Sequence, residues 1–188
     1  MAKTYNTIGT FVAGNVLTAA EMNEIGENSN NFRVPAGCKV RRDATQSIAN
    51  NTQRLINWDA QSFDTDGMFT ASSLTITINT AGIYIVQATV RYPLNTTSTR
   101  GAAIVRNATI SGSGDSANVT AGVRIGVSYF DRSPDTQSAV SVTAVESLDV
   151  ADTISVIAYQ NSGVALDTGG QTTTEPTTCS VIWLGQAS

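Results

Sequence analysis

The feature that most constrains the fold of this chain is an alternation of apolar and polar residues with a period of two. From Val34 onward, β-branched and aromatic residues alternate with polar ones between clusters of Gly, Asn, Ser and Asp. This pattern is typical of half-buried β-strands joined by turns. It predicts strands at Cys38–Asp43, Arg54–Trp58, Leu74–Ile78, Ile83–Tyr92, Gly101–Ile110, Thr120–Tyr129, Ala139–Leu148, Thr153–Tyr159 and Thr178–Leu184.

So many short strands in one chain indicate an all-β protein, an antiparallel sandwich or jelly roll. The strand expected at 83–92 has two distinct faces. One face is wholly apolar and is expected in the core: Tyr84, Val86, Ala88, Val90 and Tyr92. The other face starts with Ile83 and Ile85 and continues with polar residues, a pattern expected where a neighbouring subunit covers part of a sheet. Ile83 and Ile85 are therefore our candidate residues for a subunit interface.

One helix is predicted before the strands, from Ala19 to about Glu27. Thr18 and Glu21 have the spacing of a capping box, and Gly26 with the asparagines after it is expected to end the helix after two to three turns. So short a helix is marginal alone and needs a surface on which to dock. We therefore expect residues 1–33 to form an anchor arm and residues 34–188 a separate head. The arm's expected docking residues are Phe11, Leu17, Met22 and Ile25.

Composition argues against most enzymatic functions. The chain has 188 residues, a formal net charge of −4 and no histidine, which removes Ser/His and Cys/His nucleophiles and His-ligated zinc. Clustered Lys and Arg, which nucleic-acid binding requires, are missing. Three pairs of carboxylates complete no calcium loop and are expected to cap turns: Asp64/Asp66, Asp131/Asp135 and Asp149/Asp152. We expect no enzyme, cofactor, metal or nucleic-acid partner; a glycosidase built on two aspartates is the alternative left open.

No segment has the pattern of a signal peptide or the length of a membrane-spanning helix. We therefore expect synthesis in a host cytoplasm and no membrane insertion. The two cysteines, Cys38 and Cys179, are too few for a disulfide framework and are expected to stay reduced.

Four segments resemble landmarks of the tumour-necrosis-factor and complement-globular-head superfamily. They are Leu55-Ile56-Asn57-Trp58, the stretch Phe63–Thr70 with its Gly67-Met68-Phe69-Thr70, Ala81-Gly82-Ile83-Tyr84, and Leu148–Val156. The resemblance implies a ten-strand jelly roll that assembles as a homotrimer. The chain departs from the family at Ala151, where Gly is usual, and has no collagen-like stalk, so no cytokine or complement role is carried over.

The family pairs its first and last strands, which would contain Cys38 and Cys179. If each cysteine opens its strand, antiparallel pairing sets them at opposite ends of the pair, too far apart for a disulfide.

The N-terminal segment Thr10–Asn23 resembles an attachment segment found in structural proteins of tailed bacteriophages. Together the two resemblances imply a virion protein with a small anchor, bound to other virion proteins, and a trimeric jelly-roll head. Two function classes stay open: a capsid decoration, cement or head-fibre protein, and a tail fibre or tail tip that binds a host glycan. A secreted lectin would be expected to carry a signal peptide.

The candidate glycan contacts lie at the end of one predicted strand: Tyr129, Phe130, Asp131 and Arg132. Aromatic residues beside a turn on a rigid sandwich are suited to ligand contact. Trp58, Tyr159 and Trp183 could also stack on sugar rings if exposed, but aromatic residues in strands more often fill the core, where we expect these three.

Overall fold

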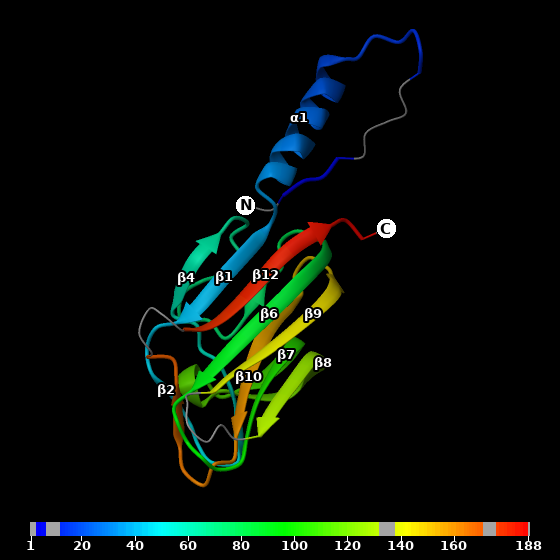
Figure 1. Ribbon diagram of the computed structural model, residues 1–188. Helices are drawn as coiled ribbons and strands as arrows, with labels where there is room; N and C mark the ends of the chain where they lie inside the picture. Colours follow the sequence, from blue (N-terminus) through cyan, green and yellow to red (C-terminus); the bar gives the residue numbers. More distant parts are fainter. Residues whose placement is uncertain (1–2, 7–11, 132–137, 171–175, 188) are drawn as a thin grey trace.

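The fold was analysed in a computed structural model, which describes residues 3–6, 12–131, 138–170 and 176–187. A helix precedes an antiparallel β-sandwich of two main sheets (Figure 1). The first sheet has the strand order β4-β1-β12-β6-β9 and the second β3-β10-β7-β8, with β5 paired to β10. The elements are α1 (Ala19–Arg33), β1 (Gly37–Arg42), β2 (Gln46–Ile48), β3 (Thr52–Leu55), β4 (Ala60–Asp64), β5 (Ile76–Thr77), β6 (Gly82–Tyr92), β7 (Thr99–Ser111), η1 (Gly114–Ser116), β8 (Asn118–Asp131), β9 (Ser138–Leu148), β10 (Thr153–Gln160), β11 (Leu166–Thr168) and β12 (Thr177–Gly185). The expected all-β jelly roll with a short N-terminal helix is confirmed.

The core lies between the two sheets and is built as the alternation predicted. Five residues of β6 are fully buried: Tyr84, Val86, Ala88, Val90 and Tyr92. Alternate residues of β10 face them from the second sheet, among them Ile154, Val156 and Ala158. Trp58 and Trp183 also belong to this core, as expected.

Nine of the strands match the predicted segments, and three short strands were not predicted. The missed strands are β2, β4 and β11; β2 pairs only with β11 in a separate two-stranded sheet. The two strands of that sheet have three residues each, too few for a period of two to stand out in the sequence.

The helix is longer than the sequence predicted. The capping box is present, since the Thr18 hydroxyl accepts from the Glu21 amide and the Glu21 carboxylate accepts from the Thr18 amide. The expected end near Glu27 was wrong, because α1 continues through four polar residues to Arg33. It ends where Pro35 restricts Val34 to an extended backbone conformation.

The two cysteines lie closer together than expected. Cys38 is opposite Val181 and Cys179 is opposite Val40, so the two thiols are diagonal neighbours on adjacent strands. The placement at opposite ends was wrong because β1 has only six residues and pairs with residues 177–182 of β12, which sets Cys38 and Cys179 only two positions apart along the pair. Both cysteines are buried and no disulfide joins them, and burial raises the pKa of the Cys38 thiol to about 12.

Gly82 fixes the start of β6. Its backbone is in the left-handed region (φ +153°), and a Cβ atom there would lie 2.1 Å from the Trp183 indole nitrogen. The same indole donates a hydrogen bond to the Ala81 carbonyl (3.2 Å). Tyr84, two residues after Gly82, donates a hydrogen bond from its hydroxyl to the Thr80 carbonyl. The sequence Ala81-Gly82-Ile83-Tyr84 thus meets a steric requirement at the end of β12.

Candidate functional surfaces

The outer face of the first sheet is not covered by any other element of the described sandwich. In Figure 1, β6 and β12 lie in front of β7 and β10, with no element of the chain over them. Ile85 on β6 pairs with Ile182 on β12 and with Val145 on β9, so the three apolar side chains form one row across three strands. Val145 is 61% exposed and Ile83 36% exposed.

Polar but uncharged side chains surround this apolar row. The residues that face outward on β6, β9 and β12 include Gln87, Thr89, Ser141, Thr143 and Ser180, and none of the outward residues of these three strands is acidic. Glu146 on β9 points to the opposite side, where it pairs with Arg106 of the second sheet (2.9 Å). Covering this face would therefore remove no carboxylate from water. The structure places the predicted interface residues Ile83 and Ile85 on it.

The predicted glycan contacts do not form one surface. Tyr129 pairs with Gly101 and lies on the outer face of the second sheet, whereas Phe130 pairs with Arg100 and points to the other side. Asp131 accepts a hydrogen bond from the Thr99 hydroxyl (2.6 Å), and Arg132 lies outside the described residues. The interpretation of these neighbours as one cluster was wrong, because successive residues of a strand face opposite ways.

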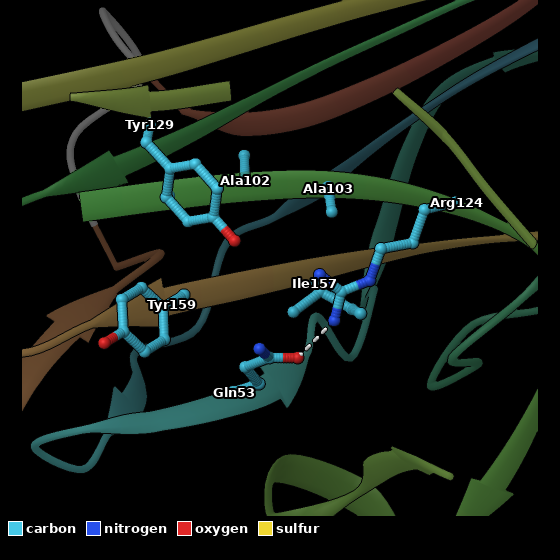
Figure 2. Close-up of a pocket in the computed structure, with 8 residues that line it drawn as sticks. Gln53, Ala102, Ala103, Arg124, Tyr129, Ile157 and Tyr159 are labelled. Atoms are coloured by element: carbon cyan, nitrogen blue, oxygen red, sulfur yellow. Dashed lines mark hydrogen bonds between the residues drawn. The ribbon is translucent and has the colours of Figure 1, made fainter. Parts of the chain in front are cut away.

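Tyr129 instead borders a shallow depression on the outer face of the second sheet (Figure 2). Its ring lies across Gly101, where a Cβ atom would come within 2.6 Å of two ring carbons. Tyr159 of β10 stands nearly perpendicular to Tyr129, with ring centroids 6.1 Å apart. Gln53 and Arg124 close the other side and are joined by a hydrogen bond of 2.8 Å.

Sequence reasoning missed Tyr159, Gln53 and Arg124 as members of this site. Tyr159 was assigned to the core, but it is half-buried on the outer face. The three residues come from β10, β3 and β8, so only the sheet order brings them together. No local motif in the sequence marks them.

The N-terminal arm has two parts with different surroundings. Helix α1 projects from one end of the sandwich, has no buried residue and leaves Met22 52% and Leu17 43% exposed (Figure 1). Ile25 is half-buried, and Phe11 lies outside the described residues.

Residues 3–6 run back along the helix to the sandwich. The Asn28 side chain exchanges two hydrogen bonds with the backbone of Asn6, and the Asn31 amide donates to the Thr4 carbonyl. Tyr5 then stacks on Trp183, with centroids 4.2 Å apart and an interplanar angle of 11°. Phe32 of α1 contacts the same indole (ring centroids 6.0 Å apart) and the Lys3 amide donates to the Thr80 hydroxyl (2.8 Å), so the arm is attached to the head around Trp183.

A buried carboxylate lies below this contact. Asp66 is fully buried, accepts a hydrogen bond from the Thr80 hydroxyl (2.9 Å), and has one carboxylate oxygen without a partner among the described residues. Desolvation by burial raises the pKa of Asp66, against the opposing effects of its Thr80 hydrogen bond and of Lys3.

Asp64 and Asp152 cap turns, as expected, whereas Asp131 accepts from the Thr99 hydroxyl of the neighbouring strand. Asp64 accepts from the backbone amides of Asp66, Met68 and Phe69, and Asp152 accepts from the amide of Asp149. Asp135 lies outside the described residues. Within the described ranges no group of three or more His, Cys, Asp or Glu side chains could hold a metal ion. In the same part of the chain, no helix is long and apolar enough to cross a membrane.

Comparison with known proteins identifies the fold. No protein-family model and no curated protein sequence matches this chain. Solved structures do match. Murine APRIL at pH 5.0 has a TM-score of 0.57 and 13% identity, and the match covers 79% of this chain and 98% of that one. The globular domain of zebrafish complement 1qA has a TM-score of 0.54 and 11% identity, with 81% of this chain and 99% of that one covered. Eiger TNF from S. frugiperda is similar as well, with a TM-score of 0.59 and 12% identity over 81% of this chain and 94% of that one. These are tumour-necrosis-factor and C1q domains, which are non-enzymatic, and the likeness shows the fold.

The raised pKa of Asp66 predicts a specific pH dependence. A carboxyl group whose pKa is raised by folding stabilises the native state fully below its unfolded pKa, and this stability is lost as the pH rises through the folded pKa. Asn cannot ionise, so the Asp66→Asn variant does not lose stability as the pH rises. We expect the melting temperature of the variant to exceed that of the wild type by a few degrees at pH 7, and by less at pH 4.

Asp167→Asn, on the exposed side of β11, is the control for removing one negative charge. Thermal unfolding followed by circular dichroism from pH 4 to pH 7 measures both variants. A difference between Asp66→Asn and wild type that stays constant or shrinks with rising pH would contradict the assignment.

The stacking of Tyr5 on Trp183 predicts that the arm stabilises the head. Tyr5→Ala removes this contact and should lower the free energy of unfolding by ~2 kcal/mol. Tyr5→Phe keeps the ring and removes only a buried hydroxyl that lacks a partner, so its stability should be close to that of the wild type. Urea denaturation compares the three proteins.

Deletion of residues 1–33 removes the same ring. We therefore expect the deletion to lower the melting temperature, whereas a head that folds separately from the arm, as the sequence predicted, would keep it nearly unchanged. Equal stability of Tyr5→Ala and wild type would show that the stack contributes nothing.

Proposed function

We propose that this chain is a non-enzymatic, homotrimeric structural protein displayed on the surface of a tailed-bacteriophage particle. The observation that carries the trimer is the uncovered outer face of the first sheet, with its row of Val145, Ile85 and Ile182. Tumour-necrosis-factor and C1q-like domains are typically homotrimers, and this chain shares their fold.

The chemistry of the face suits a ring of three subunits. An exposed apolar row surrounded by neutral polar side chains is typical of an interface core and its rim. A heterologous contact of this face with a different surface of the next copy closes under threefold symmetry. Ile83 and Ile85 are the residues that we assign to the interface, joined by Val145 and Ile182.

Particle attachment is assigned to the N-terminal arm. The support is the resemblance of Thr10–Asn23 to phage attachment segments, together with a helix that projects from the sandwich and buries none of its residues. A capped helix whose apolar residues Met22 and Ile25 are not buried by its own chain is suited to docking on another protein. The protein would be made in the host cytoplasm and localise to the virion, where it serves as a decoration, cement or head-fibre protein.

A receptor-binding role in a tail fibre or tip is the second candidate function. The depression beside Tyr129 favours it, because that site lies on the sheet opposite the proposed interface.

The trimer is tested by mass and by mutation of its interface. Multi-angle light scattering should give three times the 19.7 kDa of one chain. Ile85→Glu places a charge at the centre of the apolar row and should weaken association by about 100-fold or more, giving the monomer mass. Val164→Glu, at an exposed valine outside the face, should leave the trimer intact.

Circular dichroism of Ile85→Glu separates loss of assembly from loss of folding. A wild-type protein that has the mass of one chain at micromolar concentration would overturn the trimer.

The anchor is tested by incorporation into particles. Met22→Asp together with Ile25→Asp adds two charges to the apolar contact that we propose and should abolish incorporation. The control is Asn23→Asp, an exposed polar position on the same helix. Particles are assembled with each variant, purified by sedimentation and assayed for the protein. Undiminished occupancy of the double variant would assign attachment to the jelly roll.

A further inference from the structure

The depression on the second sheet is hollow because small residues line its floor. Across the strands, one row reads Gln53, Tyr159, Gly101 and Tyr129, and the adjacent row includes Ile157 and Ala103. Gly101 and Ala103 of β7 add no bulk between the side chains of β10 and β8. Figure 2 shows Tyr129, Tyr159, Gln53 and Arg124 standing around Ile157 and Ala103. The depression is shallow, with room inside it for little more than one water molecule, so a ligand would lie on the exposed side chains at its rim instead of entering it.

The aromatic wall presents a surface on which a ring can pack. Tyr129 is 55% exposed although it belongs to a long, regular strand. Its one ring face covers Gly101, and the perpendicular Tyr159 ring forms a corner with it. Flat apolar surface beside polar groups is complementary to a sugar, which carries C–H bonds on its faces and hydroxyl groups on its edge.

Hydrogen-bond donors without partners surround the same space. Of the Arg124 guanidinium, only Nη2 has a partner, the Gln53 Oε1 atom. Among the described residues the Arg124 Nε and Nη1 atoms, the Gln53 amide nitrogen and the Tyr129 hydroxyl have none. Every one of these groups is able to donate, and an acceptor-rich ligand is therefore favoured.

The charge at the site further restricts the ligand. Arg124 forms no ion pair within the described part of the chain. Gln53 holds the guanidinium beside the tyrosines, where it can donate two parallel hydrogen bonds to a carboxylate. A single arginine on a chain of net charge −4 is poorly suited to a phosphate backbone.

We propose that this depression, formed by Gln53, Tyr129, Tyr159 and Arg124, binds one acidic sugar unit, a saccharide ring that carries a carboxylate. The ring packs on Tyr129 against Tyr159, and the carboxylate accepts from Arg124. The site lies on the sheet opposite the apolar row, so burial of the apolar row does not itself cover it. Binding at one chain is expected to be weak, with a Kd on the order of 1 mM, and to be strengthened on a polymer that spans several copies.

Ligand-observed NMR and titration of the full-length protein test the proposal. The probes are the methyl glycosides of glucuronic, galacturonic and N-acetylneuraminic acid, with neutral methyl glucoside and methyl galactoside beside them, up to about ten times the expected Kd. We expect at least one acidic glycoside to bind about tenfold more tightly than the neutral ones. The bound acid identifies its source among uronic-acid polymers and sialylated glycans.

Matched variants locate the site. Arg124→Gln should weaken acidic-sugar binding by about tenfold and remove the preference over neutral sugars, and Tyr129→Ala should weaken binding of both. The controls are Arg54→Gln and Phe130→Ala, which alter adjacent residues of β3 and β8 that point to the opposite face. Both should bind as the wild type does.

Three results would overturn the proposal. They are no binding of any glycoside at these concentrations, equal binding of acidic and neutral glycosides, and equal weakening by the Phe130→Ala control. Binding is measured per chain, so a monomeric protein, which would refute the proposed trimer, still gives a decisive result here. Circular dichroism confirms that each variant is folded.

Discussion

Burial of one side of every long strand between the two sheets is the constraint on which the other features depend. Tyr84, Val86 and Val90 on β6 face Ile154 and Val156 on β10, and none of them is exposed to solvent. Once these sides are committed to the core, the alternate residues of the same strands must lie on an outer face. The core thus decides that Ile85, Ile182 and Val145 share one outer face, and that Tyr159 and Tyr129 share the other.

Two of the loops are held by buried arginine side chains. The fully buried Arg100 donates to the carbonyls of Asn95, Thr97 and Ser98, and burial lowers the pKa of its guanidinium. Arg42 bonds Asp115 of η1 (2.9 Å) and the Asn57 carbonyl. The guanidinium groups of Arg100 and Arg42 supply hydrogen-bond donors to these loop carbonyls and to the Asp115 carboxylate. Because burying a charge costs free energy, we infer that the two arginines fix the geometry of the loops more than they add net stability.

The sequence was informative where a periodic pattern was long. The two faces of β6 could be read from it because eleven residues repeat the same alternation. The helix start could also be read, since Thr18 and Glu21 are three residues apart and interact locally. The helix end, the three-residue strands and the stack of Tyr5 on Trp183 depend on contacts between distant segments. The separation of Tyr129 from Phe130 followed from alternation alone and was available in the sequence.

The two outer faces differ in a way that suits different partners. On the first sheet the outward apolar residues belong to three adjacent strands, so they form a row that a second protein surface can cover without gaps. On the second sheet glycine and alanine interrupt the row, so the tyrosines and Arg124 surround a depression that a flat protein surface would leave partly empty. A ring with polar substituents can instead pack on the exposed Tyr129 and accept hydrogen bonds from Arg124 without filling the depression. The same alternation therefore gives one face the shape for self-association and the other the shape for a small polar ligand.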